Sequence, residues 1–141
     1  MIKNSLNKEI PKYKIKKPRH YSRHPQPGYV VKGRVWLEKD GELYIGGGRI
    51  ILLERIEQLG SIAAAARSMG LGYRNAWLWV ESMNRLAPSP LVGKNTGGAT
   101  GGNAWLTEYG RVVVEQYQKL NSKLQKLLKQ NNFKDTISIE I

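Results

Sequence analysis

Residues 60–87 read GSIAAAARSMGLGYRNAWLWVESMNRLA, and the architecture of the chain follows from this stretch. Ser61 is a favourable N-cap for a helix over Ile62–Met69, and the alanine run in that helix predicts that another helix packs closely against it. A tight turn over Gly70–Gly72 leads into a longer helix over Tyr73–Leu86. A short alanine-rich helix, a glycine turn and a longer helix with polar residues at its start are typical of a helix-turn-helix.

A hairpin is predicted directly after these two helices. Pro88 and Pro90 end the longer helix, residues 91–94 form a short strand, and residues 104–106 form the returning strand. The loop between the strands is rich in glycine, so its exposed amides could donate to phosphates or enter a minor groove. Its position favours a wing over a merely flexible loop.

Another hairpin is predicted before the helix-turn-helix. Apolar and polar residues alternate over residues 30–46 around Lys39–Gly41. A three-residue loop with Gly41 in the left-handed region would place Leu37 opposite Leu43 on one face, whereas a two-residue loop would mix the faces. The sequence therefore favours a three-residue loop.

A helix is predicted between this hairpin and Ser61. Gly46–Gly48 match neither GxGxxG nor GxxxxGK[ST], so we interpret them as a hinge and not as a phosphate-binding loop. The helix covers Arg49–Leu59, and Gly60 supplies its left-handed C-cap. Its apolar stripe consists of Ile50, Leu52, Leu53, Ile56 and Leu59.

A long helix is predicted over residues 107–132, with Thr107 as its N-cap. At ~1.5 Å per residue it would be about 37 Å long, too long to be buried whole against so small a domain. A dimer interface is therefore favoured over a purely internal face. The apolar residues at heptad spacing are Val113, Tyr117, Leu120, Leu124 and Leu127. The tail over residues 133–141 is either an added strand or without order.

The chain is strongly basic, with 23 Lys and Arg residues, 11 Asp and Glu residues, a net charge of +12 and a pI near 10.0. Nucleic acid is the commonest large anion that such a chain binds. Residues 1–28 hold eight of the basic residues, one acid and no apolar periodicity, which predicts a disordered basic arm. The arm either contacts phosphates, which we favour, or serves as a solubilising tail.

Catalytic, metal and cofactor sites are not expected. The two histidines, His20 and His24, lie four residues apart in the arm without a carboxylate partner. No pair of acids has a spacing that calls for acid–base chemistry. The chain has no cysteine, no long apolar run and no apolar signal-peptide core, so we expect a cytoplasmic protein without a membrane span.

Two groups of residues resemble the winged helix of the molybdate-responsive regulator ModE. The first group is Gly60-Ser61-Ile62, Ala65-Ala66, Met69-Gly70, Tyr73-Arg74-x-Ala76-Trp77 and Met83-Asn84. The second group is Leu91-Val92, Thr96-Gly97-Gly98, Gly101-Gly102 and Leu106-Thr107-x-x-Gly110. The chain is most similar to the short ModE-like regulators, often grouped with LysR-type winged helices, that consist of this domain alone. The resemblance implies a dimeric, sequence-specific transcription regulator whose recognition helix begins near Tyr73.

The chain departs from that family in three ways. Full-length ModE carries C-terminal oxyanion-binding modules, whereas the resemblance covers roughly residues 43–120 and the chain ends at Ile141. We therefore expect no such module and transfer no molybdate control, and a small-molecule effector remains unknown. Gly72 stands where the family usually has serine. Leu78 and Trp79 replace smaller or more polar residues. Either Leu78 touches a thymine methyl or, as we favour, the pair packs on the first hairpin.

The predicted DNA contacts centre on the start of the recognition helix. Arg74 and Asn75 suit guanine and adenine edges, although both could hold phosphates instead. Tyr73 either reaches a phosphate or packs beneath its helix, Ser61 is able both to cap and to contact the backbone, and Trp77 is assigned to the core. The full predicted set is Ser61, Arg67, Tyr73, Arg74, Asn75, Lys94, Thr96, Gly97, Gly98 and Thr100.

The sequence thus predicts a mainly α protein with small β hairpins, a winged helix-turn-helix with a long C-terminal dimerisation helix. Its parts are a basic arm over residues 1–28, a DNA-binding domain over 29–106, a dimerisation helix over 107–132 and a tail over 133–141. The predicted function is a homodimeric regulator that binds a pseudo-palindromic operator in double-stranded DNA. The alternatives are a winged-helix protein-interaction module and a non-specific nucleic-acid binder driven by the basic arm.

Overall fold

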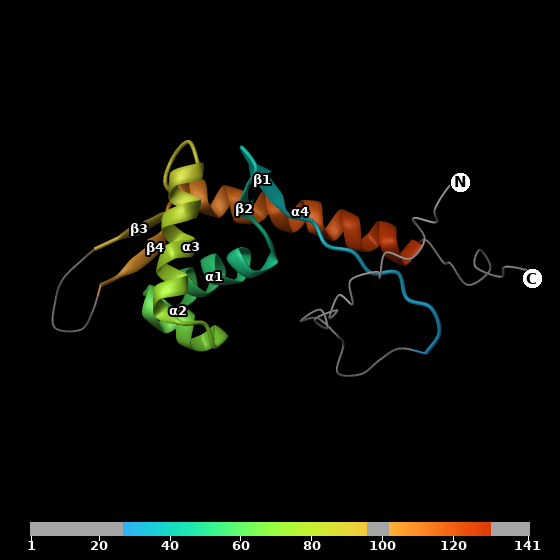
Figure 1. Ribbon diagram of the computed structural model, residues 1–141, viewed down its shortest axis with the longest axis horizontal. Coiled ribbons are helices and arrows are strands. Elements are labelled where there is room, and N and C mark those ends of the chain that lie inside the picture. The colour runs from blue at the N-terminus through green and yellow to red at the C-terminus, as the bar shows by residue number, and fades with distance from the viewer. Residues whose placement is uncertain (1–26, 96–101, 131–141) are drawn as a thin grey trace, which may run out of the picture.

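The computed structural model describes residues 27–95 and 102–130. The chain folds in the order β1 (Leu37–Lys39), β2 (Glu42–Ile45), α1 (Gly47–Leu59), α2 (Ile62–Met69), α3 (Tyr73–Leu86), β3 (Val92–Lys94), β4 (Ala104–Leu106) and α4 (Glu108–Gln130) (Figure 1). The strands form two separate antiparallel hairpins, β1–β2 and β3–β4. The prediction of a mainly helical chain with small hairpins is confirmed. Most of the basic arm, the centre of the glycine-rich loop and the predicted tail lie outside the described residues.

The boundaries of α2 and α3 agree with the predicted ones because short-range contacts determine them. The Ser61 Oγ accepts a hydrogen bond from the Ala64 N–H at 3.0 Å, which satisfies one free donor of the first turn of α2. Gly70 ends α2 with φ 63°, a conformation that favours glycine. Thr107 likewise caps α4, since its Oγ1 accepts from the Gly110 N–H at 3.0 Å.

The core lies where α1, α2 and α3 meet. Leu52, Leu53 and Ile56 of α1 are fully buried, and Ala65 of α2 and Val80 of α3 are buried with them. The buried alanines allow the close helix packing that the alanine run predicted. The predicted apolar stripe of α1 is confirmed except at its last member. Leu59 is exposed because α1 ends there and the chain turns away into α2.

The first hairpin differs from its prediction in the length of its loop. Asp40 and Gly41 alone form the turn, with φ 52° and 79°, as a two-residue type I′ turn requires. Leu37 pairs with Ile45, not with Leu43. The three-residue loop was therefore wrong: Glu38 pairs with Leu43, and an irregularity in the ladder after Leu37 brings Leu37 opposite Ile45.

The glycines after this hairpin belong to α1 more than to a hinge. Gly46 is the N-cap, and α1 begins at Gly47, two residues before the predicted start. A Cβ on Gly48 would lie 3.4 Å from the indole ring of Trp79, so that ring packs on the first turn of α1. Trp79 is therefore packed, as favoured, and α1 is the neighbour that this contact identifies.

Two projections extend from the helical core in opposite directions (Figure 1). The hairpin β3–β4 projects on one side, and the C-terminal part of α4 projects on the other. The extended chain before β1 runs along α4. Gln125 Nε2 donates to the Gly33 carbonyl at 3.0 Å, and the Tyr117 hydroxyl donates to the Val35 carbonyl at 2.9 Å.

Candidate nucleic-acid interface

The N-terminal half of α3 presents most of its side chains to solvent. Tyr73, Arg74 and Asn75 are all exposed, while Ala76 is fully buried and anchors this turn in the core. Arg74 makes no hydrogen bond or ion pair with another described residue. The first turn therefore carries a cation, an amide and a phenol that are free to contact a ligand.

Two predicted contacts on α2 lie at its surface. Arg67 is exposed and, among the residues that the structure describes, has no ion-pair partner. The half-buried Ser61 is occupied as an N-cap, although its hydroxyl keeps a proton to donate. Both residues are compatible with a phosphate contact, and the contacts within the chain do not test this role for either of them.

Four of the described cations outside this surface form ion pairs. Arg85 binds Glu42 at 3.0 Å, Arg111 binds Glu57 at 3.1 Å, and Lys119 binds Glu115 at 3.0 Å. From Ser61 to Leu106 the sequence has a single acid, Glu81, and its carboxylate is bound to Lys94. Arg67 and Arg74 keep unpaired positive charge on α2 and the start of α3, which suits a polyanion. Other described cations without an ion pair include Lys32, Arg34, Arg55, Lys123, Lys126 and Lys129.

The prediction that Trp77 lies in the core is wrong. Its side chain is 40% exposed, and the Lys94 ammonium lies 4.9 Å from its ring centroid. The alanine face of α2 packs against Ala76 and Val80, so the neighbouring position 77 turns toward the second hairpin. Leu78 is also exposed.

Asn84 belongs to the residues that resemble ModE, and the structure gives it a role in holding the second hairpin. Its Oδ1 accepts from the Leu91 and Val92 N–H groups at 2.9 and 3.1 Å, and its Nδ2 donates to the Val92 carbonyl at 3.0 Å. These three bonds attach the start of β3 to α3. An asparagine late in a helix, one turn before a proline, was the signal that could have suggested such a tie.

Three side chains attach the first hairpin to the C-terminal half of α3. The Arg49 Nη1 donates to the Ser82 Oγ at 3.1 Å and to the Leu43 carbonyl at 2.8 Å. Burial lowers the pKa of Arg49. Lys39 donates to the Leu86 carbonyl at 2.8 Å, and Arg85 completes the set with its ion pair to Glu42.

The predicted dimer residues divide into two groups on α4. Tyr117 is only 8% exposed and Val113 packs against the core, so these two side chains pack within the chain itself. Leu124 is half-buried, whereas Leu120 and Leu127 are exposed large apolar residues. The heptad therefore does not form one uniform free stripe: its first part is covered by the chain itself.

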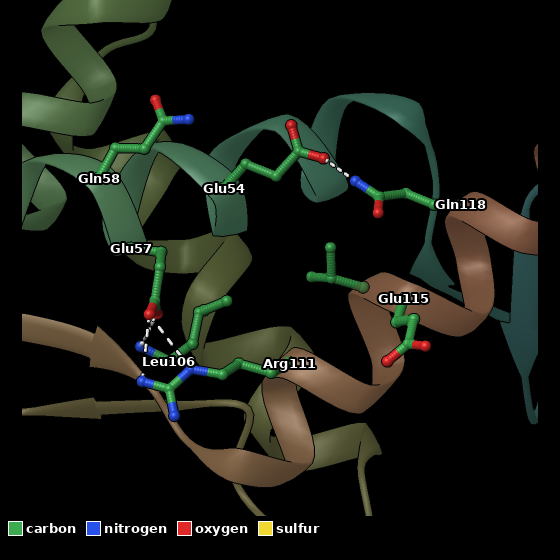
Figure 2. A pocket seen from close by; sticks show the side chains of 8 residues that line it. Glu54, Glu57, Gln58, Leu106, Arg111, Glu115 and Gln118 are labelled. Carbon is green, nitrogen blue, oxygen red and sulfur yellow. Dashed lines mark hydrogen bonds and ion pairs between the residues drawn. The ribbon is translucent and has the colours of Figure 1, made fainter.

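A shallow groove between α1 and α4 is lined by acids whose partners lie within the chain (Figure 2). Glu57 accepts from the Leu106 N–H at 3.3 Å and from Arg111, while Glu54 accepts from Gln118. These bonds attach α4 and β4 to α1. Across the described ranges, no three His, Asp or Glu residues are grouped in a way that could hold a metal ion.

None of the helices that the structure describes is long and apolar enough to cross a membrane. No family model matches the chain. Over 92 residues the chain is 45% identical to the molybdenum-pterin-binding protein MopA of Rhodobacter capsulatus, covering 65% of this chain and 35% of that protein.

Two further relatives carry the ModE name. The molybdenum transport protein ModE of Azotobacter vinelandii is 43% identical over 95 residues, covering 67% of this chain and 35% of that protein. The DNA-binding transcriptional dual regulator ModE of Escherichia coli K12 is 38% identical over 90 residues, covering 64% of this chain and 34% of that protein. The chain thus spans about a third of the length of these curated relatives. Taken together, these similarities support a ModE-like family for this chain.

Proposed function

We propose that this chain is a sequence-specific, DNA-binding transcription regulator with a winged helix-turn-helix. The observation that carries the proposal is the first turn of α3, where Arg74 and Asn75 are exposed and Arg74 is unpaired within the described residues. A helix that follows a short capped helix and a glycine turn is the element that enters a major groove in such proteins. The relatives named as ModE regulators support the same class.

The proposed contacts follow from side-chain chemistry. Arg74 pairs with guanine O6 and N7, and Asn75 pairs with adenine N6 and N7. Arg67, Ser61 and Tyr73 hold phosphates on either side of the groove. The predicted wing contacts Thr96, Gly97, Gly98 and Thr100 lie outside the described residues, on the loop that joins β3 to β4.

The second part of the proposal is a homodimer formed through α4. Leu120 and Leu127 are exposed on the helix, and Leu124 is half-buried between them. Two-fold pairing of such a helix would present two recognition helices to half-sites about one helical turn apart, so the operator is pseudo-palindromic. The molybdenum in the names of several relatives is not assigned to this chain, since the match covers about a third of those proteins.

The proposal is tested by selecting bound duplexes from a randomised DNA pool at ~150 mM salt. A two-fold symmetric motif is expected, and the Arg74→Ala, Asn75→Ala double variant should not recover it. Binding that yields no motif and disappears as salt rises would overturn the proposal in favour of a charge-driven binder. No DNA binding at any salt concentration would point to a protein-interaction module.

Deletion of the basic arm should change the same binding measurements in a different way. Because phosphate contacts carry no sequence information, deletion of residues 1–28 should weaken binding to all duplexes alike and flatten the salt dependence. An arm deletion that changed the selected motif would contradict this role.

A further inference from the structure

One face of α3 is turned toward β3. Trp77, Glu81 and Asn84 follow one another at spacings of four and three, which places them in one row along the helix. Each of the three contacts the β3 segment: Asn84 binds its backbone at Val92, and Glu81 and Trp77 contact Lys94. The row is therefore the seam between α3 and the second hairpin.

The Lys94 side chain lies on the helix-facing side of this hairpin. Side chains alternate along a strand, so Lys94 shares a side with the buried Val92, and its cross-strand partner Ala104 is also buried. Its ammonium pairs with the Glu81 carboxylate and lies 4.9 Å from the Trp77 ring centroid. The Lys94 side chain is only 27% exposed. Lys94 is thus largely covered and paired, whereas Arg67 is exposed and has no ion-pair partner among the described residues.

The opposite side of the hairpin is closed by a different contact. The Trp105 indole lies over Gly93, where a Cβ would come within 2.5 Å of its Nε1 atom. Trp105 pairs directly with Gly93 across the strands and is partly exposed. The two faces of the hairpin thus make different contacts: the face with Lys94 packs against α3, and the opposite face is covered by Trp105.

We propose that Lys94 is a positioning residue that sets the angle between the second hairpin and α3, and not a phosphate contact. Asn84 fixes the base of the hairpin, and the Lys94–Glu81–Trp77 contact fixes β3 at its far end, two residues beyond Val92. β4 is held separately, since the Ala104 N–H donates to the Gly60 carbonyl at 2.8 Å and the Leu106 N–H donates to Glu57. The Lys94 contact adds an attachment on β3 and so fixes this strand at both of its ends against α3. The inference rests on the proposed function, because it concerns how DNA is held.

The two roles for Lys94 predict opposite signs for one substitution. If Lys94 positions the hairpin, Glu81→Gln removes its partner and weakens DNA binding. If Lys94 binds a phosphate, the same change releases the lysine and removes a negative charge near the DNA, so binding tightens. Glu81→Gln keeps the size and shape of the side chain, so it separates the two roles with little disturbance of α3.

The experiment measures binding of the full chain to its selected duplex between 50 and 300 mM salt, a range suited to counterion release. The variants are Glu81→Gln, Lys94→Met and their combination, with Arg67→Met as the matched control for loss of a phosphate contact. We expect Glu81→Gln and Lys94→Met each to weaken DNA binding about threefold to fivefold. The combined variant should bind DNA no more weakly than the single variant with the lower affinity, because both changes break the same contact. Lys94→Met should leave the slope of log K against log salt unchanged, whereas Arg67→Met should reduce it by about 0.9.

A readout without DNA keeps the inference separate from the proposed function. Amide hydrogen exchange in β3 and β4 of the free chain should accelerate about fivefold in Glu81→Gln and Lys94→Met, and not in Arg67→Met. Tighter DNA binding by Glu81→Gln, a slope reduced by Lys94→Met, or unchanged exchange in both variants would each overturn the positioning role. If the parent chain selects no duplex, the proposed function fails, while the exchange rates still decide how the hairpin is held.

Discussion

The two halves of α3 differ in what surrounds them, although they belong to one continuous helix. In the first half, Tyr73, Arg74 and Asn75 are exposed and Ala76 alone anchors the turn. In the second half nearly every polar side chain has a partner within the chain. Ser82 binds Arg49, and Arg85 binds Glu42 of the first hairpin. Glu81 and Asn84 bind the β3 segment. One half is available to a ligand, and the other half is fixed to the rest of the domain.

This division indicates how a small domain can hold a binding helix in a fixed orientation. A helix whose polar side chains are all free would be positioned only by its apolar face, which tolerates sliding and rotation. Directional bonds from two hairpins at one end remove that freedom without using any side chain of the proposed DNA contact. The division predicts that substitutions in the first half change affinity and leave stability nearly unchanged. Substitutions in the second half should change stability, and should change affinity only where they release the second hairpin, as at Glu81.

The largest expected effect is the loss of affinity in the Arg74→Ala, Asn75→Ala double variant. Each bidentate base contact contributes ~1–3 kcal/mol of discrimination, so we expect about 3 kcal/mol, or roughly 100-fold weaker binding to the selected operator. The free energy of unfolding in urea should stay within ~0.5 kcal/mol of the parent, since both side chains are exposed.

This double variant also needs a test of specificity. Binding to an unrelated duplex should fall much less than binding to the operator, because phosphate contacts elsewhere remain. Equal losses on both duplexes would mean that these two side chains hold phosphates and that sequence is read by another element.

The next largest effect is expected from Asn84→Ala in the second half. The substitution removes three hydrogen bonds and leaves the Leu91 and Val92 amides partly buried without partners, so it should destabilise the domain by about 2 kcal/mol. Urea unfolding measures this loss. Asn75→Ala is the matched control on the same helix and should change stability by less than ~0.5 kcal/mol. Similar losses in both variants would abolish the distinction between the two halves.

The sequence predicted the parts of this comparison that depend on neighbouring residues. The ends of α2 were predicted correctly because Ser61 caps this helix and Gly70 ends it, and both effects act within one turn. The bounds of α3 follow from the glycine turn before Tyr73 and from Pro88 after Ala87. The free first turn of α3 was predictable for the same reason. Polar residues there have no neighbours along the chain with which to pair.

The second half of α3 was not predictable, because its contacts join residues far apart in the sequence. The ion pair of Arg85 with Glu42 spans 43 positions, and helical periodicity alone does not reveal that position 77 faces β3 and not α2. Tyr117 shows the same limit, since heptad spacing cannot distinguish an intramolecular face from a dimer interface. The two-residue turn at Asp40 was missed because an irregular ladder compensated for it.

A smaller effect is expected at high pH from the first hairpin. Burial, together with the nearby Tyr109 hydroxyl, raises the pKa of Tyr44 to about 12. The unfolded chain loses this proton near pH 10 and the folded chain does not, so stability is present below pH 10 and declines as the pH rises toward 12. Tyr44→Phe should remove part of this decline, about 1 kcal/mol once solvent around the ring is allowed for.

Urea unfolding of the parent and Tyr44→Phe at pH 8 and pH 11 measures the difference. The hairpin is bound to Ser82 through Arg49, so a weaker hairpin at high pH should also loosen the second half of α3. Parallel curves for the two proteins would show that the Tyr44 proton does not contribute, and that the alkaline decline arises elsewhere, for example at Tyr117, whose pKa burial also raises.

The smallest effect is expected from the exposed ion pair between Glu42 and Arg85. The Arg85 guanidinium hydrogen bonds to the Glu42 carboxylate and lowers its pKa below the ordinary value of 4.5. The pair therefore stabilises the fold above pH 4.5, and its contribution is lost as the pH falls through the lowered pKa of Glu42. Thermal unfolding of Glu42→Gln should show a slightly lower Tm than the parent at pH 7, and the difference should vanish in 1 M salt.

This weak contact gives the most sensitive check on the separation of the two halves. Arg85 lies three turns along α3 from Arg74, so Glu42→Gln should leave operator affinity unchanged within twofold while its small Tm effect remains measurable. Loss of affinity without a matching loss of stability would mean that the hairpin transmits its position to the first turn. The helix would then move as one rigid body, and the attachment at its C-terminal end would itself determine how Arg74 and Asn75 approach the DNA.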